Sequence, residues 1–282
     1  MKIVTVSTKS DGYFPVLKKI CKKNNHELVV LGYGEKWKGW VWRSKMFINY
    51  VSKCDPDEII MIVDAYDVMV LASHKEIMKK YKKFKCDILF SASCVDSGQP
   101  NISWLYRNVI FNQVKNYFDV PDYKSYILNA GTFMGKASKI HELYNRLYKR
   151  YVKTLVLDDQ TNLNNIRLTG LNYKIDKDSE IFWIWERTSF KELIYFWIYN
   201  ELYEKTHIYN KGRVQFNNIQ PCVVHGIGNR VMDKLCFQVK IPYKTILNLN
   251  KKSIAQNDIK IFMVMGKLII IILLLVIIKY FI

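Results

Sequence analysis

The sequence lacks the cysteine patterns of a zinc ribbon or a compact disulfide framework. No CxxC pair occurs among its six cysteines, which lie at positions 21, 54, 86, 94, 222 and 236. The N-terminus also lacks the apolar core of roughly 7–15 residues that a secretory signal needs, and Lys2–Ser7 is typical of a first strand instead. Together these absences predict free thiols in a reducing compartment.

Internal repeats and low-complexity linkers are absent as well. The chain has 282 residues, of which 50% are hydrophobic and 14% aromatic. This composition argues against extended disorder and predicts one substantial catalytic domain with short appendages.

Acidic residues are scarce relative to basic ones, 25 against 43, so the formal net charge is +18. Such a balance favours an anionic partner: nucleic acid, a phosphate-bearing substrate or an acidic membrane surface. A general enrichment in lysine explains the charge equally well. A membrane-tethered basic nucleic-acid-binding protein is the alternative from a different class, but the basic residues are dispersed and carry no nucleic-acid-binding signature. We therefore expect no nucleic-acid partner.

The C-terminal residues 261–282 are almost entirely apolar. A bilayer core about 30 Å thick needs roughly 20 helical residues, so the uninterrupted run Leu268–Ile278 spans it only if Lys267 and Lys279 snorkel to opposite interfaces. A buried or surface-lying helix is the alternative. We expect a domain over 1–245, a polar tether over 246–260 and a membrane anchor over 261–282, with the catalytic domain facing the cytosol.

The alternation of short apolar runs and amphipathic stretches predicts an α/β fold. The expected strands are 2–7, 27–32, 58–63, 87–92, 180–186 and 221–225, and the expected helices are 13–24, 43–53, 74–84 and a longer one after Gly135. Ser73 and Glu76 form a capping-box signature at the start of the third helix.

Two carboxylates follow the buried strand Ile59–Val63, namely Asp64 and Asp67. If they act together the chain must turn there, because residues three apart in a strand point to opposite faces. The carboxyl edge of an open α/β sheet is where ligands bind. A divalent ion shared with a diphosphate suits this pair, and an ordinary strand-end turn is the alternative.

A second apolar strand ends in His225, followed by Gly226, Gly228 and Arg230. An imidazole beside two carboxylates shifts metal preference towards Mn²⁺. The glycines allow close backbone approach to a phosphate, and Arg230 carries a neutralising charge. A structural histidine is the alternative.

Gly131 interrupts a further strand two residues after Asn129, which predicts either close approach of a sugar ring or a β-bulge. Asp158 and Asp159 open the next helix, where they either cap it or contact the donor sugar or the acceptor.

In order, these motifs resemble the glycosyltransferase domain of the multifunctional procollagen lysyl hydroxylases and related viral collagen-modifying enzymes. The resemblance covers residues 2 to about 245 and rests on seven segments: Thr5–Thr8 with Asp11–Tyr13, Leu31–Trp37, Ile59–Val68, Leu89–Ala92, Leu128–Gly131, Asp158–Gln160 and Val223–Gly226.

The resemblance implies a GT-A fold, a mixed sheet flanked by helices, and a UDP-glucose or UDP-galactose donor bound through Mn²⁺. It implies that Asp64, Asp67 and His225 bind the metal and that Thr8 and Tyr66 contact the uridine. Asn129, Gly131, Gly228 and Arg230 are the further expected donor contacts, and Asp159 with Asp158 the expected catalytic residues. The implied acceptor is hydroxylysine or galactosyl-hydroxylysine in a collagen-like protein, and transfer to a glycan or to a non-collagen protein is the alternative.

Two departures from the family stand out. The Gly-rich segment with its phosphate-contacting lysine is shortened, so Lys38, Arg43 and Lys45 compete for that role. A tryptophan expected after Leu89–Ala92 is replaced by the stretch 94–97, which leaves the acceptor pocket open to differences.

Overall fold

The computed structural model describes residues 1–93, 127–153, 159–166, 168–185, 208–210, 213–215, 219–227 and 232–241. Within these ranges no helix is both long and apolar enough to cross a bilayer. The proposed tether and anchor, residues 246–282, lie outside them. No cysteine in the described ranges forms a disulfide, in agreement with the sequence expectation.

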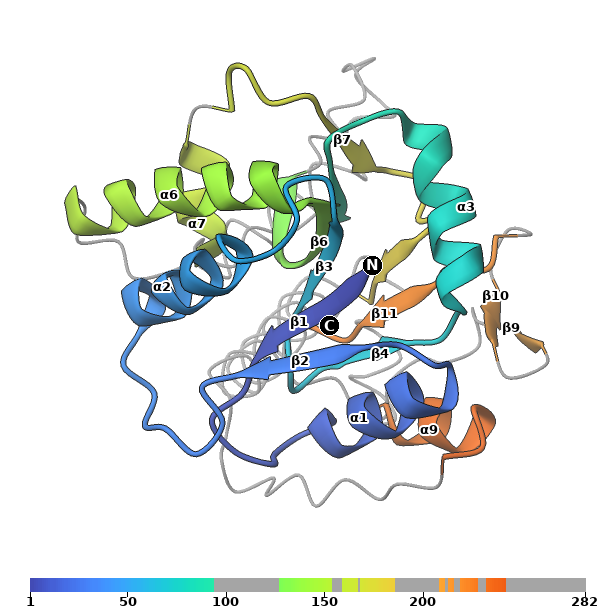
Figure 1. Cartoon of the computed structure of the whole chain (residues 1–282). Helices are drawn as coiled ribbons and strands as arrows, with labels where there is room; N and C mark the ends of the chain where they lie inside the picture. Colours follow the sequence, from blue (N-terminus) through green and yellow to red (C-terminus); the bar gives the residue numbers. More distant parts are fainter. Residues whose placement is uncertain are drawn as a thin grey trace, which may run out of the picture.

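A six-stranded mixed sheet forms the centre of the domain, with strand order β2-β1-β3-β6-β5-β7 (Figure 1). Its strands are β1 (Lys2–Val6), β2 (Leu28–Leu31), β3 (Ile59–Val63), β5 (Ile88–Ser93), β6 (Ile127–Lys136) and β7 (Tyr173–Asp176). Strand β1 runs parallel to β2 and β3, and β7 runs parallel to β5, whereas β6 runs antiparallel to both its neighbours. The expected α/β architecture with a mixed sheet is confirmed.

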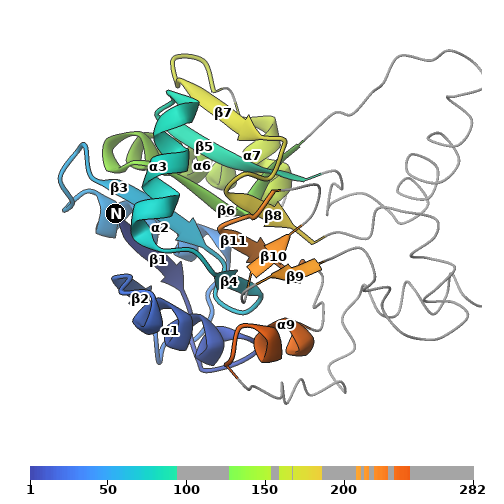
Figure 2. The ribbon, with the colours of Figure 1, turned by 90° about the vertical axis from the view of Figure 1, so that its right-hand side faces the viewer.

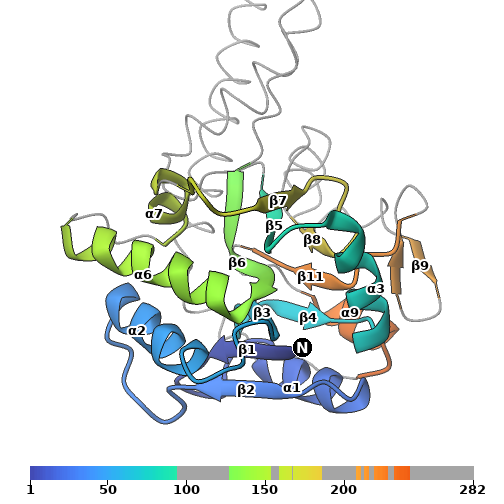
Figure 3. The same cartoon turned by 45° about the horizontal axis from the view of Figure 1, so that its top comes forward.

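Helices cover both faces of this sheet, as Figures 1 and 3 show. Helices α2 (Trp40–Val51), α6 (Ala137–Lys153) and α7 (Asp159–Asn165) pack on one face, and α1 (Phe14–Lys23) and α3 (His74–Phe84) on the other. The two cores exist because side chains alternate along a strand. In β3, Ile60 and Ile62 join the core under α2 and α6, while Met61 and Val63 join the core under α1 and α3.

A smaller sheet lies beside the first and has the order β4-β11-β8. It consists of β4 (Val68–Val70), β11 (Val223–His225) and β8 (Phe182–Ile184). Strand β11 is antiparallel to β4 and parallel to β8. The hairpin of β9 (Ile208–Asn210) and β10 (Arg213–Gln215) and helix α9 (Asp233–Gln238) complete the described part, with α9 next to α1 in Figure 2.

The boundaries of the predicted elements agree with the structure to within two residues, except that helix α2 begins at Trp40 where a start at 43 was expected. Strands β4, β7, β9 and β10 and helix α9 were not predicted. The earlier start brings Trp40 into the helix, where its ring lies 5.4 Å from the Arg43 guanidinium. The predicted cap of α3 is confirmed, since the Glu76 backbone N–H donates to Ser73 Oγ at 3.3 Å.

Candidate active site

The chain turns sharply between β3 and β4, and this turn places two carboxylates where the two sheets meet. The Asp64 backbone N–H donates to the Gly131 carbonyl at 2.7 Å, and the Gly226 N–H donates to the Asp67 carbonyl at 2.8 Å. His225 pairs with Val68 across the small sheet. The two aspartates are thus fixed by backbone contacts to β6 and β11, and the turn predicted between them is present.

Asp64, Asp67 and His225 lie together, with one ligand-type atom of each within 4.8 Å of the others. His225 Nε2 is 3.4 Å from Asp67 Oδ1 and 3.8 Å from Asp64 Oδ2. The His225 side chain is buried, at 4% exposure, while the aspartates retain 34% and 24%. The three side chains that the sequence proposed as metal ligands therefore form one cluster.

The space around the cluster fits a divalent cation. Gly131 faces it, and a methyl group added there would overlap Asp64 Oδ2 and His225 Cε1. Two carboxylates and an imidazole are a donor set that Mn²⁺ and related ions accept. Burial raises the pKa of the Asp64 carboxyl, Arg43 opposes this shift, and the neighbouring Asp67 adds to it. A bound cation would relieve that repulsion.

Arg43, one helical turn after Trp40 in α2, joins the metal cluster to α7. Its Nη2 donates to Asp64 Oδ1 and its Nη1 to Asp159 Oδ2, each at 2.5 Å. The side chain is only 8% exposed. Burial acts to lower the pKa of the guanidinium, but the carboxylates of Asp64 and Asp159 outweigh it and raise that pKa above its ordinary value. Arg43 is a permanently charged bridge between two proposed functional residues.

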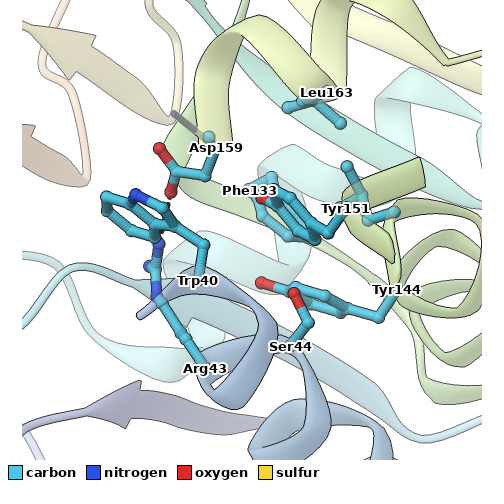
Figure 4. Close-up of a pocket in the computed structure, with 10 residues that line it drawn as sticks. Trp40, Arg43, Ser44, Phe133, Tyr144, Tyr151, Asp159 and Leu163 are labelled. Atoms are coloured by element: carbon cyan, nitrogen blue, oxygen red, sulfur yellow. Dashed lines mark hydrogen bonds and ion pairs between the residues drawn. The ribbon is translucent and has the colours of Figure 1, made fainter. Parts of the chain in front are cut away.

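Lys38, Arg43 and Lys45 were the three candidates for the phosphate-contacting residue, and the structure places them differently. Lys38 pairs with Glu35 at an exposed position, and the Lys45 ammonium lies over the Tyr148 ring. Of the three, Arg43 alone reaches Asp64 in the described structure. Its guanidinium also lies 5.4 Å from the Trp40 ring centre, as Figure 4 illustrates.

The proposed uridine contacts also lie side by side. The Thr8 backbone N–H and Ser7 Oγ donate to Tyr66 Oη at 3.1 and 3.3 Å. Burial acts to raise the pKa of the Tyr66 phenol, but hydrogen bonds from Ser7 and Thr8 lower it on balance. Tyr66 lies between Asp64 and Asp67 in the chain, so the end of β1 and the metal cluster border each other.

The strand that carries Gly131 is explained by contacts within the protein. Asn129 is 2% exposed, accepts from the Gly131 N–H at 3.0 Å and donates to Gln160 Oε1 at 3.2 Å. Asp64 and His225 are the side chains that approach Gly131. The register between β5 and β6 shifts between the pairs Phe90–Phe133 and Ala92–Leu128, so the extra residues lie on β6, in the segment 129–132 that contains Gly131, as the β-bulge interpretation predicted. Neither sequence interpretation foresaw that metal-site side chains make Gly131 necessary.

Four of the sequence expectations fall outside the described residues: Asp158, Gly228, Arg230 and the stretch 94–97. Asp159 is the first residue of α7, as expected for a helix-opening acid. Nothing in the sequence alone distinguished Arg43 from Lys38 and Lys45. The local sequence offers one hint, which is that Arg43 follows Trp40 by one helical turn on α2, the helix before the strand that ends at Asp64.

A sequence model described as the PLOD GT domain matches residues 1–235. The chain belongs to the PLOD GT domain family. The predicted glycosyltransferase class is thereby confirmed at the level of the family. As a member of the PLOD GT domain family, the chain is expected to share the family's glycosyltransferase scaffold.

Named relatives agree with this assignment. The human multifunctional procollagen lysine hydroxylase and glycosyltransferase LH3 is 28% identical over 247 residues, which cover 80% of this chain and 29% of that protein. The procollagen-lysine,2-oxoglutarate 5-dioxygenase of Drosophila melanogaster is 26% identical over 192 residues, covering 64% of this chain and 25% of that protein. The uncharacterized protein R699 of Acanthamoeba polyphaga mimivirus is 27% identical over 145 residues, covering 48% and 29% respectively. The chain therefore spans under a third of each of these relatives.

Two solved structures resemble the fold at low identity. The galactosyltransferase LgtC, in complex with donor and acceptor sugar analogs, is 12% identical, with a TM-score of 0.42 over 89% of this chain and 99% of that one. A glycosyltransferase involved in glycosylating the major capsid of PBCV-1 is 13% identical, with a TM-score of 0.37 over 62% and 82%. The family assignment rests on the sequence match.

Proposed function

We propose that the chain is a Mn²⁺-dependent GT-A glycosyltransferase that moves glucose or galactose from a UDP-sugar. The proposed acceptor is hydroxylysine or galactosyl-hydroxylysine in a collagen-like protein. The observation that carries the proposal is the meeting of Asp64, Asp67 and His225 at one edge of the domain, with Arg43 joining them to Asp159. The relatives named for procollagen lysine modification support the choice of acceptor.

Each residue has a distinct part in this proposal. Asp64, Asp67 and His225 hold the cation, which when bound takes up negative charge on the diphosphate as a Lewis acid. Arg43 orients Asp64 through one nitrogen and Asp159 through the other. Because the buried guanidinium of Arg43 is fixed before the donor arrives, it stabilises the developing charge electrostatically without having to reorganise. Asp159 is then placed to orient the sugar or the acceptor hydroxyl.

Thr8 and Tyr66 hold the uridine side of the donor, and Asn129 and Gly131 border the sugar side. Asn129 is held by hydrogen bonds on both sides of its amide. A site assembled from α2, α7 and the ends of four strands is rigid, as transfer chemistry requires.

The test is release of UDP from UDP-glucose and UDP-galactose by the full chain, with and without Mn²⁺ and a hydroxylysine peptide. Asp64→Asn is expected to lower turnover at least about a hundredfold, since even outer partners of metal ligands cost tenfold or more. Asp57→Asn is the matched control, because the Asp57 side chain is 80% exposed and, within the described ranges, forms its ion pair with Lys136. Turnover that is independent of Mn²⁺, or equal in Asp64→Asn and the wild type, would refute the metal site. Transfer to a glycan but not to the peptide would point to the alternative acceptor.

We also propose that residues 261–282 attach the chain to a membrane and leave the catalytic domain on the cytosolic side. The apolar run Leu268–Ile278 between two lysines supports this. Alkaline extraction of membranes from cells expressing the chain with and without 261–282 tests it. Equal release of both forms would overturn the proposal.

A further inference from the structure

A small pocket lies behind Arg43, between α2, α6, α7 and β6. It is bounded by Trp40, Arg43, Ser44, Phe133, Tyr144 and Asp159. In Figure 4 the Tyr144 and Ser44 hydroxyls point into it from one side, with Trp40 and Arg43 on the other. We refer to it as the Arg43 pocket. Arg43 and Asp159 line it, and the Arg43 guanidinium also contacts Asp64 of the proposed metal site.

Two hydroxyl groups in this pocket have no protein partner. Ser44 is 2% exposed and Tyr144 is 5% exposed. Neither side-chain hydroxyl forms a hydrogen bond with any residue in the described ranges, although each faces the pocket. Buried hydroxyls are rarely left unpaired, because the lost hydration costs free energy. The pocket is therefore built to receive something that hydrogen-bonds.

The charges around the pocket limit what that ligand can be. Arg43 already binds two carboxylates, so it offers no free positive charge for a phosphate or a carboxylate. Burial raises the pKa of the Tyr144 phenol, which remains a neutral donor and acceptor. Phe133 and Leu163 supply an apolar floor. A neutral group that pairs a hydroxyl with a methylene suits these walls.

The volume of the Arg43 pocket limits the possible ligand further. The enclosed space holds about one water-sized group and not a sugar ring. The hydroxyl end of a sugar's exocyclic arm is small enough, whereas its methylene would lie at the mouth and the ring would remain outside, on the side of Asp159.

We propose that the Arg43 pocket binds the hydroxymethyl group of the transferred hexose and so selects hexose donors over pentose donors. Tyr144 and Ser44 are the specificity-determining residues, and both hydrogen-bond the sugar hydroxyl. This inference rests on the proposed function, since it needs a nucleotide-sugar donor at the Asp64 cluster. Selection follows because a donor without the arm leaves the two hydroxyls to water and gains a hydrogen bond from neither.

The test uses UDP-glucose and UDP-xylose, which differ only in the hydroxymethyl group. Calorimetric titration of the full chain with UDP, UDP-glucose and UDP-xylose, each with Mn²⁺, gives the three affinities. The wild type is expected to bind UDP-glucose roughly tenfold or more tightly than UDP-xylose. Tyr144→Phe and Ser44→Ala are each expected to reduce that ratio about fivefold, the value of one hydrogen bond, and to leave the affinity for UDP-xylose unchanged.

Tyr148→Phe, one turn along α6, is the matched control and should leave the ratio intact. Tyr144→Phe keeps the ring that stacks on Phe47 at 4.7 Å, so its unfolding temperature should equal or exceed that of the wild type. An unchanged ratio in Tyr144→Phe and Ser44→Ala would mean that the pocket holds ordered water only, and would overturn the inference. If UDP binds but the wild type does not discriminate between the two sugars, the inference fails alone. If UDP itself does not bind, the proposed function fails first.

Discussion

Replacement of Arg43 by methionine removes the cation shared by Asp64 and Asp159 while keeping a similar aliphatic volume. The two carboxylates would then be left without their buried partner. Breaking a buried ion pair from one side costs roughly 3–5 kcal/mol, because the remaining charge stays desolvated. Asp64 and Asp159 are 34% and 18% exposed, so water screens part of this cost and the lower end applies, about 3 kcal/mol.

A loss of about 3 kcal/mol lowers the melting temperature of a domain of this size by roughly 6–12 °C. The assay is thermal unfolding of the full chain at pH 7 and low salt, without divalent ions. Arg43→Lys keeps the charge but has no planar fork to reach both carboxylates, so an intermediate loss is expected. Adding Asp159→Asn to Arg43→Met should recover part of the stability by removing one unpaired charge.

Arg146 offers a matched control. It contacts Glu142 at the same 2.5 Å, but on the surface of α6, with side-chain exposures of 29% and 37%. Surface pairs contribute about 0–1 kcal/mol, so Arg146→Met should shift the melting temperature far less. Equal shifts in Arg43→Met and Arg146→Met, or no recovery on adding Asp159→Asn, would refute the reasoning that burial makes the Arg43 bridge important.

Two further predictions follow from the packing and the charges. Gly131→Ala should weaken Mn²⁺ binding at least about tenfold in calorimetry, because the added methyl overlaps two of the candidate ligands. Gly135→Ala overpacks the same strand against backbone, so it should cost roughly 1–3 kcal/mol of stability and leave Mn²⁺ affinity unchanged, and a similar loss of affinity in both variants would contradict the assignment. A hydrogen bond from Arg213 lowers the pKa of Glu76 below its ordinary value of 4.5, so the pair contributes stability above about pH 4.5 that is lost as pH falls through the lowered pKa. Urea unfolding should therefore show Glu76→Gln less stable than the wild type at pH 7, with the two converging as the pH falls below the lowered pKa, and a gap that persists at low pH would disprove this account.

The sequence predicted those parts of the molecule in which the signal is local. Ile59–Val63 reads as a buried strand because five consecutive apolar residues admit little else, and the carboxylates after it must then lie at the strand's end. The same reasoning placed His225 at the end of β11. Their convergence was expected only from the resemblance to a family, since nothing local in either segment refers to the other.

Long-range contacts explain what the sequence did not reveal. Strand β4 has three residues, too few for a periodic pattern, and it exists because β11 pairs with it. Arg43 looks like any surface cation of an amphipathic helix, and its burial depends on Asp64 and Asp159, which come from two other elements. The open choice among Lys38, Arg43 and Lys45 needed tertiary structure to resolve it.

The turn that carries Asp64 and Asp67 is also one of the covalent links between the two sheets. Asp64 is tied by its backbone to β6 of the large sheet, and Asp67 to the residue after β11 of the small one. An ion bound there would link the two sheets through its ligands. Loss of the ion would make the small sheet easier to open as a unit. A substitution that weakens the contacts between the two sheets would therefore lower activity even if all three metal ligands are present. Screens for inactive variants should be paired with a measure of local opening, such as amide exchange in β11.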